Sequence, residues 1–144
     1  MSAIGPLEFG DRAVGQHYHL RPGSYAVIRN GENQVAVVRT LQGYFLPGGG
    51  AEPGETPEAT LRREIREECG YEIAMIEPLG FAIQYVFAEG EGYFAKQCSF
   101  FQAKLAGHVA RQTEDDHQLI WLPISAAAET LTHASQSWAV SLVG

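Results

Sequence analysis

A charged helix preceded by a glycine loop constrains the fold of this chain more than any other feature. The segment Pro47–Gly50 places three glycines after a proline, which frees the backbone for conformations that side chains forbid. Thr56 and Pro57 then form a helix start, as N-cap and first helical residue, and Gly70 is a suitable C-terminal stop. We therefore expect a helix over Pro57–Cys69, directly after a loop of unusual backbone shape.

The remaining segments predict short strands around this helix and two helices at the end of the chain. Strands are expected at Ser24–Arg29 and Gln34–Arg39, and the turn at Asn30–Asn33 joins them as a hairpin. The other expected elements are an edge strand at Gln16–Leu20, an extended piece at Tyr44–Leu46, and strands at Ile73–Val86, Phe94–Leu105 and Gln118–Leu122. A helix that Pro123 opens is expected through Ala126–Leu131, and a terminal helix is expected at Ser135–Val143. This order indicates an α/β or α+β sandwich.

The composition indicates one globular domain spanning residues 1–144, since 45% of the residues are hydrophobic and 19% are charged. No apolar stretch approaches the roughly 20 residues that a membrane span needs, and the N-terminus lacks a secretory signal pattern. The two cysteines, without CxxC spacing, fit a reducing cytosol, so we expect a cytoplasmic protein. A net charge of −7 argues against a nucleic-acid surface. A phosphate ligand would need metal ions or a few placed arginines.

Three glutamates of the predicted helix point to a metal site. Glu64, Glu67 and Glu68 are spaced i, i+3 and i+4, so their carboxylates share one helix face within one turn. Hard oxygen ligands gathered at one point suit Mg²⁺ or Mn²⁺. The alternative is a solvated helix face with ordinary ion pairs to interleaved arginines, and for the triplet alone that alternative is favoured. The interleaved arginines are Arg62, Arg63 and Arg66.

The context of these glutamates changes the interpretation. From Gly49 the chain has five residues, Glu55, seven residues, and then the run Arg63-Glu64-Ile65-Arg66-Glu67-Glu68-Cys69-Gly70-Tyr71. This pattern resembles the Nudix box, GX5EX7REUXEEXGU, at every fixed position. Tyr71 alone departs from it, being aromatic where an aliphatic residue is usual. The chain is therefore similar to the Nudix hydrolase family, in its small bacterial MutT-like form, and the resemblance implies an α/β/α sandwich with a central mixed sheet.

The resemblance also implies roles for individual residues. Glu64 and Glu68 match the principal metal ligands, and Glu67 matches a residue that ligates metal or acts as general base. Arg63 and Glu55 match a pair that orients the carboxylates through hydrogen bonds. The carbonyl of Gly48 is expected to reach the metal.

Other site residues follow less directly from the sequence. Many family members take a further glutamate from a loop after the box, and we assign this role to Glu114, with Glu89 and Glu91 as rivals. Arg39 is a candidate to face the phosphates, and Tyr44 is a candidate to stack on a base, although each also fits an ordinary surface or core position. The five histidines are scattered, without metal-ligand spacing, and are interpreted as surface or structural residues.

The predicted function is a Mg²⁺-dependent pyrophosphohydrolase that cleaves a phosphoanhydride bond of a nucleoside diphosphate derivative by water attack at phosphorus. Nucleoside triphosphates are the favoured substrates, ahead of nucleotide sugars or ADP-ribose. The expected partner is thus a small nucleotide, with no nucleic acid and no membrane. A non-catalytic Nudix domain that senses a nucleotide is the alternative from another functional class. A homodimer is possible, but no exposed apolar stripe in the sequence argues for one.

Overall fold

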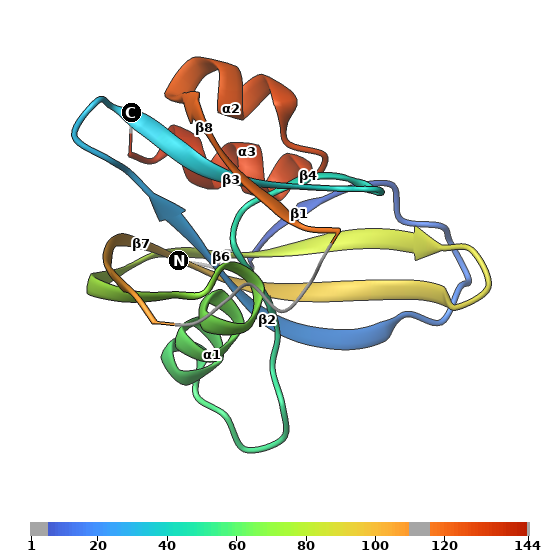
Figure 1. The fold of residues 1–144 in the computed structure, drawn as a ribbon. Helices are drawn as coiled ribbons and strands as arrows, with labels where there is room; N and C mark the ends of the chain where they lie inside the picture. The colour runs from blue at the N-terminus through green and yellow to red at the C-terminus, as the bar shows by residue number, and fades with distance from the viewer. Residues whose placement is uncertain (1–5, 110–115, 144) are drawn as a thin grey trace, which may run out of the picture.

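The computed structural model describes residues 6–109 and 116–143, and Figure 1 shows a strongly bent layer of strands with helices on both sides. The elements in chain order are β1 (Leu7–Phe9), β2 (His19–Ile28), β3 (Gln34–Thr40), β4 (Gly43–Phe45), β5 (Gly48–Gly50), α1 (Pro57–Cys69), β6 (Tyr71–Ala88), β7 (Gly92–His108), β8 (Gln118–Pro123), α2 (Ile124–Thr130) and α3 (Ala134–Ser141).

The strands form two sheets, of which the larger is mixed. Its order is β1-β6-β7-β2-β5, with β2 parallel to β7 and β6 antiparallel to β7. The smaller sheet has the order β4-β3-β8 and is antiparallel. The mixed sheet agrees with the prediction, while β6 and β7 are longer than expected and the short strand β1 was not predicted.

The predicted hairpin between the second and third strands is wrong in its pairing. The turn at Asn30–Asn33 is present, since the Asn30 amide donates to the Gln34 carbonyl at 3.1 Å. Beyond the single bridge Arg29↔Val35, however, the two strands enter different sheets. All four residues Val35–Val38 are buried, so β3 has covered faces on both sides and pairs with β4 and β8 instead.

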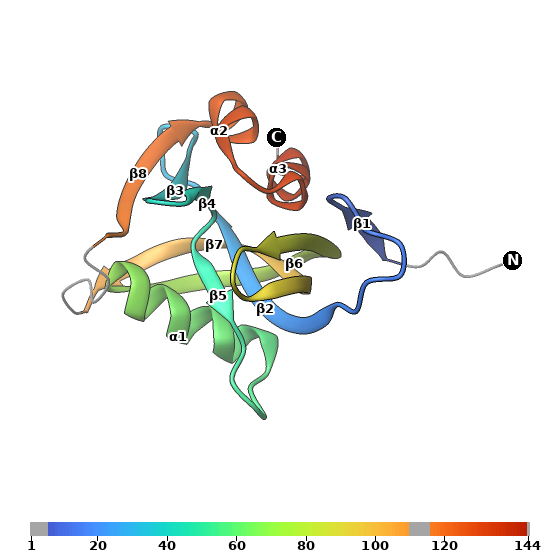
Figure 2. The same ribbon diagram turned by 90° about the vertical axis from the view of Figure 1, so that its right-hand side faces the viewer.

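Two apolar cores lie on opposite sides of this bent layer. Figure 2 shows α1 below the strands of the larger sheet and α2 and α3 above them. On the α1 side, Leu61 and Ile65 pack against Ile28 and Val38. On the other side, Val27 and Val37 pack with Ala139 and Val140. The α/β/α sandwich is therefore confirmed, and β2 contributes alternate residues to each core.

The ends of α1 follow from local chemistry, as predicted. The Thr56 hydroxyl accepts a hydrogen bond from the Ala59 amide at 3.2 Å and caps the N-terminus. Gly70 ends the helix in the left-handed conformation, with φ at 74°. Leu61, Ile65 and Cys69, four residues apart, form its buried side. No helix in the described ranges is long and apolar enough to cross a membrane.

Candidate active site on helix α1

Arg63 is the centre of a network of carboxylates on α1. Its Nη1 donates to Glu64 Oε1 at 2.9 Å and to Glu67 Oε2 at 3.2 Å. Its Nη2 donates to the Gly50 carbonyl at 2.9 Å, which ties the helix to the glycine loop. Glu64 is mostly buried, whereas the Glu67 side chain is 49% exposed and can reach solvent. One guanidinium thus fixes two of the three carboxylates predicted to bind metal.

The same guanidinium holds Glu55 in a paired interaction. Arg63 Nε and Nη2 donate to the two Glu55 oxygens at 2.7 and 2.9 Å, the parallel geometry in which such pairs are strongest. Glu55 also accepts from the Glu52 amide and the Thr60 hydroxyl. The hydrogen bond from Arg63 is the main cause that lowers the pKa of Glu55 from 4.5 to about 2, with the Glu52 amide next. Glu55 is therefore ionised at all physiological pH values.

The glycine loop lies directly against these carboxylates. A Cβ atom on Gly49 would come within 2.4 Å of Glu64 Oε2 and 2.5 Å of its Cδ. Gly48 has a φ of 145°, and a Cβ there would meet the Ser24 carbonyl oxygen at 2.1 Å. The Gly48 amide donates to Glu68 Oε1 at 3.1 Å. Gly49 is thus required for the loop to approach α1, and Gly48 is required for it to lie against β2.

Glu68 is buried and has a histidine partner that sequence reasoning missed. Its Oε2 lies 2.9 Å from His117 Nδ1, although the two residues are 49 apart in the chain. The sequence pattern indicates a surface or structural role for His117. Its approach depends on β8 lying beside β3, which no local pattern predicts. Glu114, the predicted helper carboxylate, lies outside the described residues.

The donor set fits a hard divalent cation, because three carboxylates lie on one helix face and the Gly48 loop lies beside one of them, Glu68. As placed here, Arg63 pairs with Glu64 and Glu67, and His117 Nδ1 lies within hydrogen-bond distance of Glu68. Within residues 6–109 and 116–143, no three His, Cys, Asp or Glu side chains are grouped closely enough to hold a metal ion. Glu64 and Glu67 turn toward Arg63, and Glu68 turns toward Gly48 and His117. Metal ligation by these side chains stays a prediction.

A two-part cleft opens from Glu68 on the side of the larger sheet opposite α1. The smaller part, of about 240 Å³, is lined by Gly48, Gly49, Glu68 and His117. The larger part, of about 650 Å³, is lined by aromatic side chains together with Arg21, Lys96 and His133. Tyr25, Gln42, Phe45 and Lys96 line both parts, so the two parts adjoin each other. The size of the cleft suits a nucleotide.

Tyr25 stands where the two parts of the cleft meet. Burial, followed by the charges of Cys98, Glu64 and Glu68, raises the pKa of its hydroxyl well above the usual value. The hydroxyl is therefore a permanent hydrogen-bond donor beside the carboxylates. Sequence reasoning missed Tyr25 because its strand has the pattern of ordinary core.

The two predicted substrate-binding residues, Arg39 and Tyr44, lie in different surroundings. Arg39 is exposed on β3 and donates to the Gln118 side chain. Tyr44 packs against the core that contains Val37, and its neighbour Phe45 lines the cleft instead. The structure thus offers Phe45 as the aromatic residue of the cleft, and a substrate role for Arg39 or Tyr44 stays a prediction.

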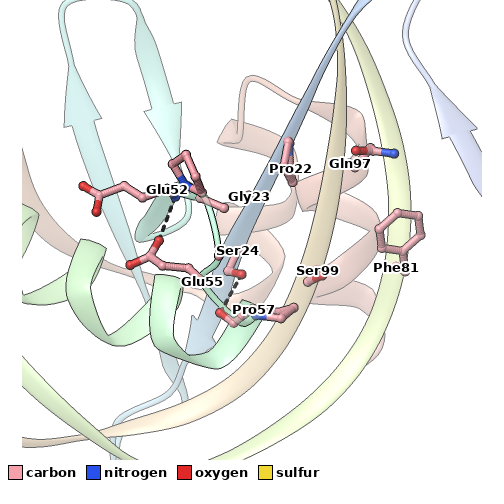
Figure 3. Close-up of a pocket in the computed structure, with 12 residues that line it drawn as sticks. Pro22, Gly23, Ser24, Glu52, Glu55, Pro57, Phe81, Gln97 and Ser99 are labelled. Carbon is pink, nitrogen blue, oxygen red and sulfur yellow. Dashed lines mark hydrogen bonds between the residues drawn. The ribbon is translucent and has the colours of Figure 1, made fainter.

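A second hollow lies on the α1 side of the larger sheet, behind the loop that precedes α1. Figure 3 shows it beside the hydrogen bond from the Ser24 hydroxyl to the Pro57 carbonyl, 2.7 Å long. It measures about 470 Å³ and includes Glu52, Glu55 and Phe81 in its lining. Its lining residues include no arginine, lysine or histidine and none of the three helix glutamates. The cleft on the other side is the better phosphate site.

Comparison with known proteins decides the family. The NUDIX domain model matches residues 19–141, which is most of the chain and includes the glycine loop and α1. The chain belongs to the Nudix family. Its predicted fold and enzyme class, a Nudix hydrolase, are thereby confirmed at the level of the family.

Individual Nudix relatives are similar over shorter stretches. The 8-oxo-(d)GTP phosphatase of Mycolicibacterium smegmatis is 29% identical over 102 residues, covering 69% of this chain and 30% of that protein. The nucleoside triphosphatase NudI of an Enterobacter strain is 60% identical over 40 residues, covering 26% of this chain and 28% of that protein. The chain thus spans under a third of the length of each of these two relatives.

The fold of this Nudix chain matches solved structures along nearly its whole length. The MutT NUDIX hydrolase from Burkholderia pseudomallei aligns with a TM-score of 0.73 at 24% identity, covering 88% of this chain and 99% of that one. A NUDIX hydrolase from Nitrosomonas europaea aligns with a TM-score of 0.70 at 17% identity, covering 85% and 87%. At these identities the likeness supports the fold alone.

Proposed function

We propose that the chain is a divalent-metal-dependent hydrolase that cleaves a phosphoanhydride bond of a nucleoside diphosphate derivative. The observation that carries the proposal is the arrangement of Glu64, Glu67 and Glu68 on one face of α1. There Arg63 orients the first two against the glycine loop. Nothing in a purely structural helix requires Gly49 to leave room for the Glu64 carboxylate. Membership of the Nudix family supports the same chemistry.

Each residue of the network has a proposed task. Glu64, Glu67, Glu68 and the Gly48 carbonyl would hold Mg²⁺ or Mn²⁺. When bound, the ion would neutralise the diphosphate and lower the pKa of an attacking water. Glu67 is the more exposed carboxylate and would accept the proton of that water. Arg63 and Glu55 position the other carboxylates. Glu114 is retained as the proposed helper carboxylate.

Nucleoside triphosphates are the proposed substrates, ahead of nucleotide sugars and ADP-ribose. The two relatives described above are named for nucleoside triphosphates and 8-oxo-(d)GTP, which supports this order. The cleft also has the parts that a nucleotide needs. The Glu68 carboxylate lies at one end, and the aromatic rings of Phe87 and Phe94 line the other. The buried Cys69 and Cys98 are compatible with the proposed reducing cytosol.

The test is hydrolysis of a nucleotide panel with Mg²⁺ or Mn²⁺, with pyrophosphate and phosphate products separated. Glu67→Gln should lower kcat by roughly 100-fold or more, as loss of a general base does. Glu58→Gln is the matched control, because Glu58 is an exposed carboxylate of the same helix that pairs with Arg62. EDTA should abolish turnover of the wild type.

Two results would contradict the proposal. Unchanged turnover in Glu67→Gln would show that the carboxylate network takes no part in the reaction. Tight, metal-dependent binding of a nucleotide without any turnover would instead support the nucleotide-sensing alternative.

A further inference from the structure

Two cations face each other on the wall of the larger part of the cleft. In the parallel pairing of β2 with β7, Arg21 is the register partner of Lys96. Both side chains line the same space of about 650 Å³, so they lie on one face of the sheet. Like charges directly opposite on neighbouring strands destabilise a sheet. This pair therefore costs stability in a protein whose net charge of −7 offers acidic residues elsewhere.

Lys96 is held away from water without a carboxylate partner. Its side chain is partly buried, and burial is the main cause that lowers the pKa of its ammonium group. Among the residues that the structure describes, the Lys96 ammonium makes no ion pair with a carboxylate within 4.0 Å. An ammonium in this setting gains most from an anionic partner, because a charge-assisted hydrogen bond is stronger where water is excluded.

Arg21 is held in the cleft by an aromatic ring. The centre of its guanidinium lies 4.7 Å from the centroid of the Phe94 ring, in cation–π contact. No carboxylate of the described residues pairs with it, so its N–H donors stay available toward the cleft. Phe94 faces His19 across the same strand pair.

The other titratable groups that line the larger part of the cleft do not neutralise the positive charges of Arg21 and Lys96. Burial, and then the charge of Lys96, lower the pKa of His133 to about 4, so His133 is neutral at physiological pH. Glu89 and Glu91 belong to the β6–β7 turn at the rim, where both are exposed and screened by water. The wall is thus rich in donors and positively charged beneath an acidic rim.

We propose that Arg21 and Lys96 form an anion subsite, which binds a phosphate or carboxylate of the substrate other than the diphosphate at the glutamates. The inference rests on the proposed function for the identity of that substrate. Lys96 lines both parts of the cleft, whereas Arg21 lines only the larger one, away from Glu68. The preferred substrates are therefore nucleoside diphosphate derivatives that carry an additional anionic group.

The first experiment tests the subsite without turnover. Inorganic phosphate is added to the metal-free protein in EDTA, at constant ionic strength, and the thermal midpoint is measured. An anion that binds only the folded state raises the midpoint by mass action. Phosphate should raise it in the wild type and in Lys104→Met, which removes the same charge from an exposed position of the same strand. The rise should be lost in Arg21→Met and Lys96→Met.

The second experiment separates the sources of the anion with matched substrate pairs under Mg²⁺. UDP-glucuronate differs from UDP-glucose by a carboxylate, and ADP-ribose 2′-phosphate differs from ADP-ribose by a phosphate. We expect kcat/KM to favour the anionic member of at least one pair by roughly 10-fold, the usual strength of one charged hydrogen bond. Arg21→Met should bring that ratio close to one.

The outcomes distinguish this inference from the proposed function. Equal phosphate stabilisation of all variants, or a substrate preference unchanged in Arg21→Met, would overturn the subsite. Phosphate stabilisation that depends on Arg21 and Lys96, in a protein that hydrolyses no nucleotide, would support the subsite and reject the hydrolase.

Discussion

At the scale of single residues, Gly49 determines how closely the loop approaches the helix. A Cβ there would overlap the Glu64 carboxylate, with 2.4 Å to Oε2. We predict that Gly49→Ala displaces Glu64 and lowers metal-dependent turnover by roughly 10-fold or more, because a misplacement of about 1 Å is costly in catalysis. Steady-state kinetics with Mg²⁺ on the best nucleotide measures the loss.

Gly50→Ala is the neighbouring control for this prediction. A Cβ on Gly50 would meet only the Pro22 carbonyl oxygen, at 3.9 Å, and the Gly50 carbonyl would still accept from Arg63. Its turnover should stay within about twofold of the wild type, since ordinary van der Waals contact costs little. Equal losses in the two variants would mean that loop flexibility, and not the position of Glu64, is what matters.

The residues of the site differ in how far the sequence could reveal them. Glu55, Arg63 and the helix glutamates lie within 14 residues of one another, and their spacing alone matches a known pattern. His117 and Lys96 reach the site only through the pairing of strands distant in sequence. Single-sequence patterns carry no information on such pairs, so they indicate Arg39 as a phosphate-facing cation and do not single out Arg21 or Lys96, which line the cleft.

At the scale of elements, the Glu55–Arg63 pair fastens the loop to α1 in a pH-dependent way. The pKa of Glu55 is about 2 in the folded protein against 4.5 ordinarily. A lowered pKa contributes stability that is complete above pH 4.5 and is lost as the pH falls toward 2. We therefore predict that the stability difference between the wild type and Glu55→Gln shrinks steadily over that interval.

Urea unfolding at a series of pH values from 7 to 2 measures this difference. The unfolding free energy of Glu58→Gln, a change at the start of the same helix, should vary with pH in the same way as that of the wild type. A gap between wild type and Glu55→Gln that stays constant with pH would show that the pair does not stabilise the fold through ionisation.

The helix α1 and the strands β2 and β3 differ in how far the sequence predicts them. The ends of α1 were predicted to the residue because Thr56 and Gly70 act on their immediate neighbours. The hairpin of β2 and β3 was wrong because a turn signal fixes where the chain reverses and does not fix which strands pair. Here burial of β3 on both faces moves it into a separate sheet.

At the scale of the whole molecule, α1 is held by the core that it shares with both sheets. Leu61 has 0% exposure and packs with residues of β2, β3 and β7. We predict that Leu61→Ala lowers the free energy of unfolding by about 2–5 kcal/mol, from lost burial and the cavity left behind. Equilibrium unfolding in urea measures the change.

The control is Leu41→Ala, since Leu41 is 86% exposed in the turn after β3. Its effect should stay within about 0.5 kcal/mol. A small loss of unfolding free energy in Leu61→Ala would mean that the two sheets stay together without the packing of α1. A change in the turnover of that variant would then report on the position of the helix alone.

The alternation of side chains along β2 has a consequence for how this protein can vary through insertions and deletions. Removing one residue of β2 would exchange the two faces of the strand on one side of the deletion, so that either Arg21 leaves the cleft or Ala26 and Ile28 leave their core. The β6–β7 turn is free of that constraint because it lies beyond the last register pair, Ala88↔Gly92. A change in its length would alter the rim around Glu89 and Glu91 while the glutamates of α1 keep their positions. Relatives of this chain should therefore differ in length at that turn and agree in the length of β2.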